Sequence, residues 1–230
     1  MFNNYMFTKN IIFKNFLGKK NKKKQKVLRN FIKSKNLVNI YPLLNSLTSN
    51  YKYSYTKKDI KNLKNYSSCN VIGIGGSILG AEAIYDFLKH KIKKNFYFFN
   101  NLESKKIAKS KDKKINLVIS KSGNTIETIS NFNLILKNQQ KNKNVIITEK
   151  SNNYLYLLAS KLKAEIFEHK NFIGGRYSVL SEVGMLPAEL MGLNERKFKR
   201  LNNLVKNNSF INILIDNVSF IYNYTIQGKK

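Results

Sequence analysis

Between about residue 68 and residue 167, short apolar runs alternate with longer segments whose apolar side chains recur at helical spacing. The run Asn-Val-Ile-Gly-Ile-Gly at 70–75 is apolar and ends in glycine, which predicts a buried strand. Residues 78–91 follow it, with Leu79, Ala83 and Phe87 at helical spacing. The same reasoning predicts further strands at 95–99, 115–120, 144–148 and 164–167, and further helices at 103–109, 125–137 and 153–161.

Five strands separated by helices predict an α/β fold in which helices cover both faces of an open parallel sheet. After a loop at 169–178 the pattern becomes helical, at 179–190, at 195–206 and less clearly at 209–226. We therefore expect one domain at 68–193, with a basic N-terminal arm or helical segment at 1–67 and a C-terminal helical connector at 194–230. The connector is expected to lead toward an absent second half.

Glycine is scarce, with 11 among 230 residues, against an average usage of about 7%. Eight of these glycines lie in three loops, at 73–80, at 123 and at 174–184. Each loop follows, or nearly follows, the carboxyl end of a predicted strand. In an open α/β sheet that edge is where ligands bind, so the three loops are the candidate site.

The first loop is Gly73-Ile-Gly-Gly-Ser-Ile-Leu-Gly80. It is not a phosphate-binding P-loop, because Ala81 and Glu82 follow Gly80 in place of Lys and Ser or Thr. It does not fit the dinucleotide-binding fingerprint either. A tight turn remains, with the Ser77 hydroxyl near the helix start and N–H groups able to hold an oxyanion or sugar oxygens. A glycine turn that serves packing alone is the alternative.

The second loop, Ser120-Lys-Ser-Gly-Asn-Thr125, stands directly before a predicted helix. Hydroxyls at 120, 122 and 125 and the N-terminus of that helix are the donors that a phosphate monoester needs. The alternative is an ordinary helix N-cap, which needs one such hydroxyl and not three. We therefore predict phosphate binding here.

The third loop, Phe172-Ile-Gly-Gly-Arg-Tyr-Ser178, contains one of only four arginines among 42 basic residues. A guanidinium retained in a lysine-rich chain suggests forked donation to an oxyanion, which an ammonium group cannot provide. A structural salt bridge of Arg176 is the alternative.

The loops together resemble the sugar isomerase (SIS) fold, a flavodoxin-like α/β architecture. The segment Gly174-Gly-Arg-Tyr-Ser-Val-Leu-Ser-Glu-Val-Gly184 is more specific, because it resembles the signature of the glucose-6-phosphate isomerase (phosphoglucose isomerase) family. Val71 to Gly80 resembles the first glycine loop of the same family, and the likeness runs from about residue 70 to residue 193.

The resemblance implies interconversion of glucose 6-phosphate and fructose 6-phosphate in glycolysis and gluconeogenesis, with no metal and no organic cofactor. It implies that Arg176 stabilises the enediolate intermediate while a carboxylate base moves a proton between C2 and C1. The residues implied to hold the substrate are Ser120, Ser122 and Thr125 on the phosphate, with Lys121 assisting through its backbone or side chain, and Gly76 and Ser77 on the sugar.

The base is not visible in these residues. In the family it lies beyond the point where this sequence ends, so we expect a truncated chain that lacks it, with Glu127 and Glu182 as the weaker candidates within the chain. The two histidines, His90 and His169, do not fall on the family's catalytic positions, and we interpret both as solvated residues.

The formal net charge of +29 raises the alternative of a nucleic-acid binder. The basic residues are spread along the whole chain and are mostly lysine, accompanied by many asparagines and isoleucines, which resembles the residue usage of an AT-rich genome. Nucleic acid is therefore not expected as the primary partner. Cys69 is the only cysteine, which favours a reducing, cytoplasmic location. No run of 18 apolar residues is present, so we expect no membrane span.

The first 58 residues contain no acidic side chain. We interpret this segment as a lysine-rich extension that packs Ile12, Phe13 and Phe16 onto the domain, and not as an organellar presequence. Two further functions stay open: a non-catalytic sugar-phosphate-binding SIS protein, and a phosphoglucose/phosphomannose isomerase of broader specificity. The family's sites imply a homodimer in the complete protein.

Overall fold

The computed structural model describes residues 22–33, 37–102, 113–138, 142–199 and 207–228. Two compact units divide the chain: Asn45–Lys197 form one, and Met1–Leu44 with Phe198–Lys230 form the other. The predicted helix at 103–109, the second half of the predicted helix at 195–206 and the packing of Ile12, Phe13 and Phe16 lie outside the described residues. The domain limits at 67/68 and 193/194 stay predictions.

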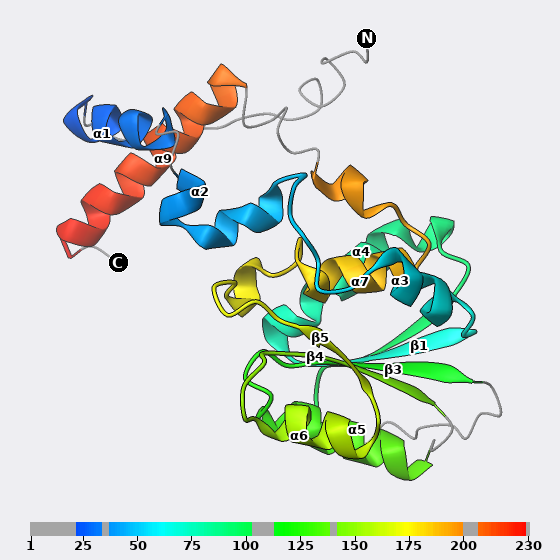
Figure 1. The fold of residues 1–230 in the computed structure, drawn as a ribbon. Coiled ribbons are helices and arrows are strands. Elements are labelled where there is room, and N and C mark those ends of the chain that lie inside the picture. The colour runs from blue at the N-terminus through cyan, green and yellow to red at the C-terminus, as the bar shows by residue number, and fades with distance from the viewer. Residues whose placement is uncertain (1–21, 34–36, 103–112, 139–141, 200–206, 229–230) are drawn as a thin grey trace. The chain divides into compact units, whose positions relative to one another are not determined.

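The larger unit is built on five parallel strands in the order β2-β1-β3-β4-β5 (Figure 1). This flavodoxin-like order confirms the expected open parallel sheet. The strands are β1 (Ser68–Ile72), β2 (Asn95–Phe99), β3 (Lys114–Ile119), β4 (Lys143–Thr148) and β5 (Glu165–Glu168). The predicted first strand was placed two residues too late, because its glycines belong to the turn that follows it.

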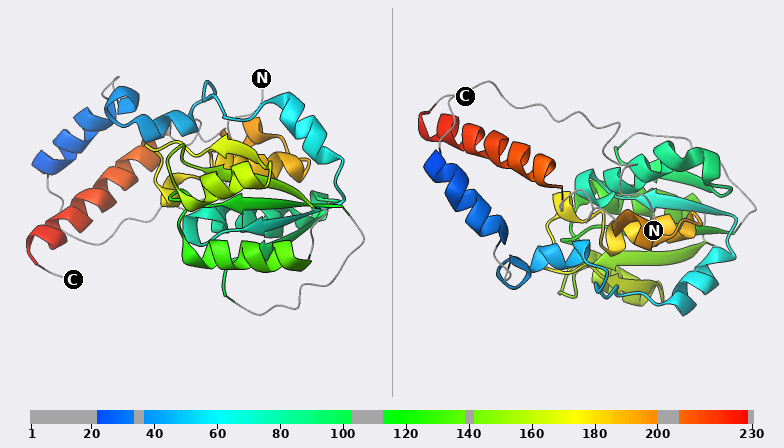
Figure 2. Two further views of the ribbon diagram at one scale, coloured as in Figure 1. Left: turned by 60° about the horizontal axis from the view of Figure 1, so that its bottom comes forward. Right: turned by 90° about the horizontal axis from the view of Figure 1, so that it is seen from above.

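Helices cover both faces of the sheet (Figures 1 and 2). Alternate strand residues supply the two cores, as the period of two requires. Val71 and Leu117 belong to the core under α3, α4 and α7, whereas Ile72 and Val118 belong to the core under α5 and α6. The helices are α3 (Lys57–Lys64), α4 (Leu79–Leu88), α5 (Ile126–Asn138), α6 (Tyr154–Lys161) and α7 (Glu182–Leu190).

Helix boundaries follow the capping residues. Helix α3, which the sequence pattern did not predict, begins with a capping box between Thr56 and Asp59. Helix α7 begins at Glu182 and not at Val179 as predicted, because the Ser181 side chain accepts a hydrogen bond from the Val183 amide. The remaining short helices are η1 (Pro42–Leu47), η2 (Gly75–Ser77), η3 (Lys89–Lys91), η4 (Gly175–Tyr177) and η5 (Glu195–Lys199), of which η5 replaces the start of the predicted helix at 195–206.

A row of asparagines crosses the sheet where the pattern predicted ordinary apolar strands. Asn70 pairs in register with Asn116, and Asn116 pairs with Asn144. The Asn70 amide donates to Asn116 Oδ1 at 2.8 Å, and the Asn116 amide donates to Asn144 Oδ1 at 2.9 Å. Buried amides are tolerated here because each finds its partner on the next strand.

The second unit contains α1 (Lys22–Lys33), α2 (Leu37–Ile40) and α9 (Asn208–Ile226), which confirms the helix expected at 209–226. Helices α1 and α9 contact each other, and Gln25 Nε2 donates to Asp216 Oδ1 at 2.6 Å. In the described part of the chain, no helix combines the length and the apolar character needed to cross a membrane.

Candidate functional site

The strand order reverses between β1 and β3, which are neighbours in the sheet although β2 lies between them in sequence. After β1 the chain enters α4 on one face, and after β3 it enters α5 on the other. The two loops therefore diverge at the carboxyl edge, which is the place where open α/β sheets bind ligands. They start in close contact, because a Cβ on Gly73 would lie 2.9 Å from the carbonyl oxygen of Ile119.

Three hydroxyls gather in the loop between β3 and α5. Ser120 Oγ lies 2.9 Å from Thr125 Oγ1, and Ser122 Oγ lies 3.4 Å from the same atom. Ser120 is buried, whereas Ser122 is exposed and Thr125 is partly exposed. The first turn of α5 begins directly after Thr125, so its free N–H groups face the same region. The cluster predicted from sequence is thus assembled at one helix N-terminus.

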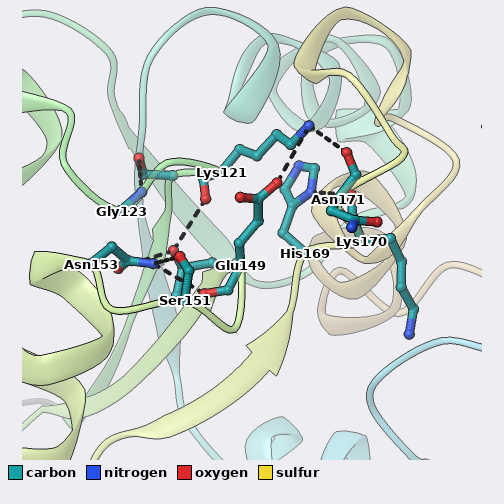
Figure 3. Close-up of polar contacts among 10 residues, drawn as sticks. Lys121, Gly123, Glu149, Ser151, Asn153, His169, Lys170 and Asn171 are labelled. Atoms are coloured by element: carbon teal, nitrogen blue, oxygen red, sulfur yellow. Dashed lines mark hydrogen bonds and ion pairs between the residues drawn. The ribbon is translucent and has the colours of Figure 1, made fainter.

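Gly123 shapes this loop against α6. Its φ of +65° lies in the left-handed region, and a Cβ there would overlap Asn153 Oδ1. Asn153 caps α6 and is held by Glu149 O and Ser151 Oγ (Figure 3). The amide of Leu155 donates to Gly123 O at 3.0 Å. The loop between β3 and α5 is therefore held against the start of α6 by these contacts.

The first and third loops touch backbone to backbone. A Cβ on Gly76 would overlap the carbonyl group of Gly175 and would lie 2.9 Å from the Arg176 nitrogen. Such an approach requires glycine, so the packing interpretation of the first glycine loop applies at this position. It also brings Gly76 and Arg176 together, although 100 residues separate them in sequence.

Ser178 fastens this contact. Its hydroxyl is fully buried and lies 2.7 Å from Gly175 O and 3.2 Å from Gly76 O. Val179 then fits between two more glycines: a Cβ on Gly80 would lie 2.7 Å from Val179 Cγ2, and a Cβ on Gly184 would overlap Val179 O. Sequence reasoning missed both roles, since only the folded chain brings 76–80 against 175–184.

Arg176 projects from η4 and is exposed. Its guanidinium forms no ion pair or hydrogen bond with any described residue, so the salt-bridge alternative finds no partner in the described part of the chain. Ser77, in the facing turn η2, is partly exposed, and its hydroxyl is likewise unpaired among the described residues. Both side chains are available to a ligand.

Lys121 extends toward the third loop. Its Nζ donates to Asn171 O at 2.7 Å and lies 3.5 Å from Glu149 Oε1 (Figure 3). The resemblance implied that Lys121 assists the phosphate through its backbone or its side chain, and the amino group of that side chain contacts protein groups here. The backbone of Lys121 stays within the hydroxyl-rich loop.

His169 lies beside this ion pair (Figure 3). Its side chain is buried, with 1% exposed, so the interpretation as a solvated residue is wrong for His169 and holds for exposed His90. His169 Nδ1 lies 3.1 Å from Lys170 O, and Nε2 is buried without a partner among the described residues. Burial lowers the pKa of this imidazole, and the Lys121 charge lowers it further.

The two candidate carboxylates have different surroundings. Glu182 is fully buried, and its oxygens accept from the Tyr51 hydroxyl at 2.8 Å and from the Ser54 amide at 2.9 Å. Burial raises its pKa. Glu127 is partly exposed on the first turn of α5, and its carboxylate has no hydrogen-bond or ion-pair partner among the described residues.

No group of three or more His, Cys, Asp or Glu side chains in the described ranges is arranged to hold a metal ion. What the loops offer is hydroxyl, backbone N–H and guanidinium donors, which suit an anionic ligand.

These features define a flavodoxin-like α/β domain with a cluster of hydrogen-bond donors at its topological switch point. The model of the phosphoglucose isomerase family matches residues 25–212, and this chain belongs to that family. Both the resemblance of the three loops and the expected SIS fold are thereby confirmed.

Curated relatives agree with this assignment. A glucose-6-phosphate isomerase of Methanocaldococcus jannaschii is 39% identical over 147 residues, which are 60% of this chain and 36% of that protein. One of Borreliella afzelii is 32% identical over 211 residues, covering 79% of this chain and 38% of its own length. The chain therefore spans little more than a third of these relatives.

Among solved structures, a hypothetical protein from Thermus thermophilus superimposes with a TM-score of 0.63 at 17% identity. The superposition covers 88% of this chain and 52% of that one, and it supports the fold.

Proposed function

We propose that this chain forms the sugar-phosphate-binding part of a glucose-6-phosphate isomerase, which interconverts glucose 6-phosphate and fructose 6-phosphate through an enediolate. The observation that carries the proposal is the cluster of Ser120, Ser122 and Thr125 hydroxyls at the N-terminus of α5. Membership of the phosphoglucose isomerase family supports it.

The phosphate is anchored by these hydroxyls and by the N–H groups of the first turn of α5. Such donors are strong toward a dianion because each hydrogen bond is charge-assisted and the helix dipole is favourably oriented. Ser122 and Thr125 make the larger contribution, since Ser120 also holds the loop through its bond with the Gly123 amide at 3.2 Å.

The sugar lies toward the contact between the first and third loops. There Gly76 and Ser77 contact its oxygens, and Arg176 stabilises the negative charge that develops on O1 and O2 in the enediolate. The guanidinium of Arg176, which is exposed and has no partner among the described residues, is what such a role requires. No metal or organic cofactor enters this scheme.

Proton transfer between C2 and C1 needs a carboxylate. Glu182 is unsuited to it while both of its oxygens are held by Tyr51 and Ser54. Glu127 has no such bond with any described residue, but its place in the first turn of α5 suits a partner of the helix dipole. We therefore expect these 230 residues to bind the substrate and to need a carboxylate from elsewhere for turnover.

Proton NMR of glucose 6-phosphate in D2O tests the division between binding and turnover. We expect the C2 proton to persist with this chain alone. Loss of the C2 signal, abolished by Arg176→Ala, would place a base within the chain and would identify it through Glu127→Gln and Glu182→Gln.

Calorimetric titration tests the binding site itself. Ser122→Ala and Thr125→Val should each weaken binding of glucose 6-phosphate, whereas Ser160→Ala on α6 is a matched control that removes an exposed hydroxyl away from the loops. A wild-type chain that binds neither glucose 6-phosphate nor inorganic phosphate would contradict the proposal. Tight, steeply salt-dependent binding of nucleic acid in its place would support the alternative raised by the net charge.

Two finer assignments belong to the proposal. We expect the complete protein to act in the cytoplasm, and to be a homodimer. Titration with glucose 6-phosphate and mannose 6-phosphate tests the broader specificity, and turnover by the complete protein separates an isomerase from a non-catalytic sensor.

A further inference from the structure

The loop at 169–178, which ends in the third loop, crosses the carboxyl edge of the sheet from β5 back to β1. It contacts residues at the ends of β4, β3 and β1, in that order. The His169 amide donates to Thr148 O at the end of β4 at 2.8 Å. Asn171 O accepts from Lys121, which follows β3, and Gly175 lies on Gly76, which follows β1. The loop is therefore held at three places, and Lys121 is the middle one.

The Lys121 anchor is made by a side chain that comes from the hydroxyl-rich loop. Its Nζ joins Asn171 O at 2.7 Å and the Glu149 carboxylate at 3.5 Å. Glu149 is held in place in turn, because its amide donates to Lys121 O at 3.2 Å. The residue that supplies this anchor stands between Ser120 and Ser122, inside the hydroxyl cluster. One residue thus connects the phosphate loop with the loop that carries Arg176.

His169 supports the same arrangement. Its buried ring lies beside Lys121 and Glu149 (Figure 3). Burial lowers the pKa of the imidazole; the charge of Lys121 also lowers it, and the charge of Glu149 raises it. A neutral ring at this place leaves the ammonium of Lys121 directed to Glu149 and Asn171 without a competing positive charge.

From this arrangement we infer that Lys121 is a positioning residue, whose amino group holds the Arg176 loop against the phosphate loop and does not bind the phosphate. The contacts of Lys121 Nζ with Asn171 O and with the Glu149 carboxylate are called the latch below. The inference rests on the proposed function for its consequence. With the latch in place, a phosphate on the hydroxyl cluster and the enediolate oxygens near Arg176 are held at a fixed separation. Without the latch, phosphate still binds, but the guanidinium of Arg176 is no longer held in the right position relative to the sugar.

Two ligands separate these roles. Inorganic phosphate reports on the hydroxyl cluster alone. A phosphorylated aldonate, whose carboxylate imitates the enediolate, also needs Arg176. The ratio of the two dissociation constants measures how well Arg176 is placed relative to the phosphate loop. A role of Lys121 in overall stability alone would leave this ratio unchanged.

Lys121→Met should reduce the preference for the aldonate by about tenfold to a hundredfold, as misplacement of a charged group by about 1 Å does. The Kd of inorganic phosphate should change by less than about twofold. Lys121→Arg, which can still donate to Asn171 O, should restore part of the preference. Lys150→Met is the matched control, because it removes the same charge from a mostly exposed side chain that lies 3.9 Å from Glu168 and outside the latch.

A double-mutant comparison tests the route of the effect. If Lys121 acts through Arg176, then Lys121→Met in an Arg176→Gln background should cause no further loss of preference for the aldonate. Equal weakening of both ligands by Lys121→Met would overturn the inference, because it would show that the amine binds phosphate. An unchanged preference would overturn it as well.

Failure of the proposed function has a different signature. If the wild-type chain binds neither ligand, the proposed function fails, and hydrogen exchange then decides the latch alone. Lys121→Met should raise amide exchange across residues 170–178, and Lys150→Met should not. Equal exchange in Lys121→Met and the wild type would refute the latch.

Discussion

Gly76 lies directly on the peptide group of Gly175, with no room between the two backbones for a side chain on Gly76. The contact is one-sided, because a Cβ on Gly175 would meet no atom within 4 Å. Two glycines that look equivalent in sequence therefore have different requirements.

Gly76→Ala should consequently destabilise the chain, whereas Gly175→Ala should not. An added methyl group on Gly76 overlaps backbone atoms that cannot rotate away, and overpacking of this kind costs about 1–3 kcal/mol. Urea unfolding of both variants, together with titration by glucose 6-phosphate, measures the difference. Equal stability of the two variants would show that the loops are not in contact.

Ser178→Ala should lower the free energy of unfolding by about 0.5–1.5 kcal/mol, because the carbonyl groups of Gly76 and Gly175 lose the hydroxyl between them. Sugar-phosphate binding should weaken as well, since the first and third loops then separate. Ser77→Ala is the matched control in the same contact: it should change stability by less than about 0.5 kcal/mol and weaken only binding. Unaltered unfolding of Ser178→Ala in urea would contradict the bridging role.

Glu182 makes stability depend on pH in an unusual direction. Its native pKa is raised by burial above the ordinary value of 4.5, so the native state binds more protons than the unfolded state over that window. The stability that this group contributes is complete below pH 4.5 and is lost as the pH rises through the raised native pKa. Wild type should therefore lose stability relative to Glu182→Gln as the pH rises from about 4.5 toward neutrality, as measured by urea unfolding. A constant difference between the two proteins would argue against burial of an ionisable carboxyl.

His169 should act in the opposite sense. Its native pKa is lowered below 6.5, so the unfolded state binds the proton more readily. The stability that it contributes is complete above pH 6.5 and is lost as the pH falls through the lowered native pKa. Relative to His169→Phe, which does not titrate, wild type should become less stable on acidification below pH 6.5. Two-dimensional NMR of the imidazole signals gives the native pKa directly, and a value at or above 6.5 would refute this account.

Much of the fold and part of the site can be predicted from local sequence. The strand at 95–99 and the helix at 153–161 agree with the structure within one residue, because each is marked by its own periodicity or cap. The hydroxyls of Ser120, Ser122 and Thr125 do come together, since only a few residues separate them and one helix start organises them.

The remainder depends on contacts between distant residues. Glu182 was a candidate base in sequence, but one of its oxygens accepts a hydrogen bond from Tyr51, which lies 131 residues away. Lys121 was implied to assist the phosphate through its backbone or its side chain, and only the fold shows that its amine reaches Asn171 at a sequence separation of 50. His169 was interpreted as solvated, yet it is enclosed where the third loop crosses the sheet edge.

By itself, then, the sequence determined the alternation of strands and helices, the positions of the three loops and the family to which the chain belongs. These follow from local backbone preferences, burial patterns and short motifs. Only the tertiary structure decided which glycine has no room for a side chain, which candidate carboxylate already accepts hydrogen bonds from the protein, and which groups the Lys121 amine contacts. Those properties depend on atoms that meet across the edge of the sheet, and their positions are set by packing of the whole unit and not by any local run of residues.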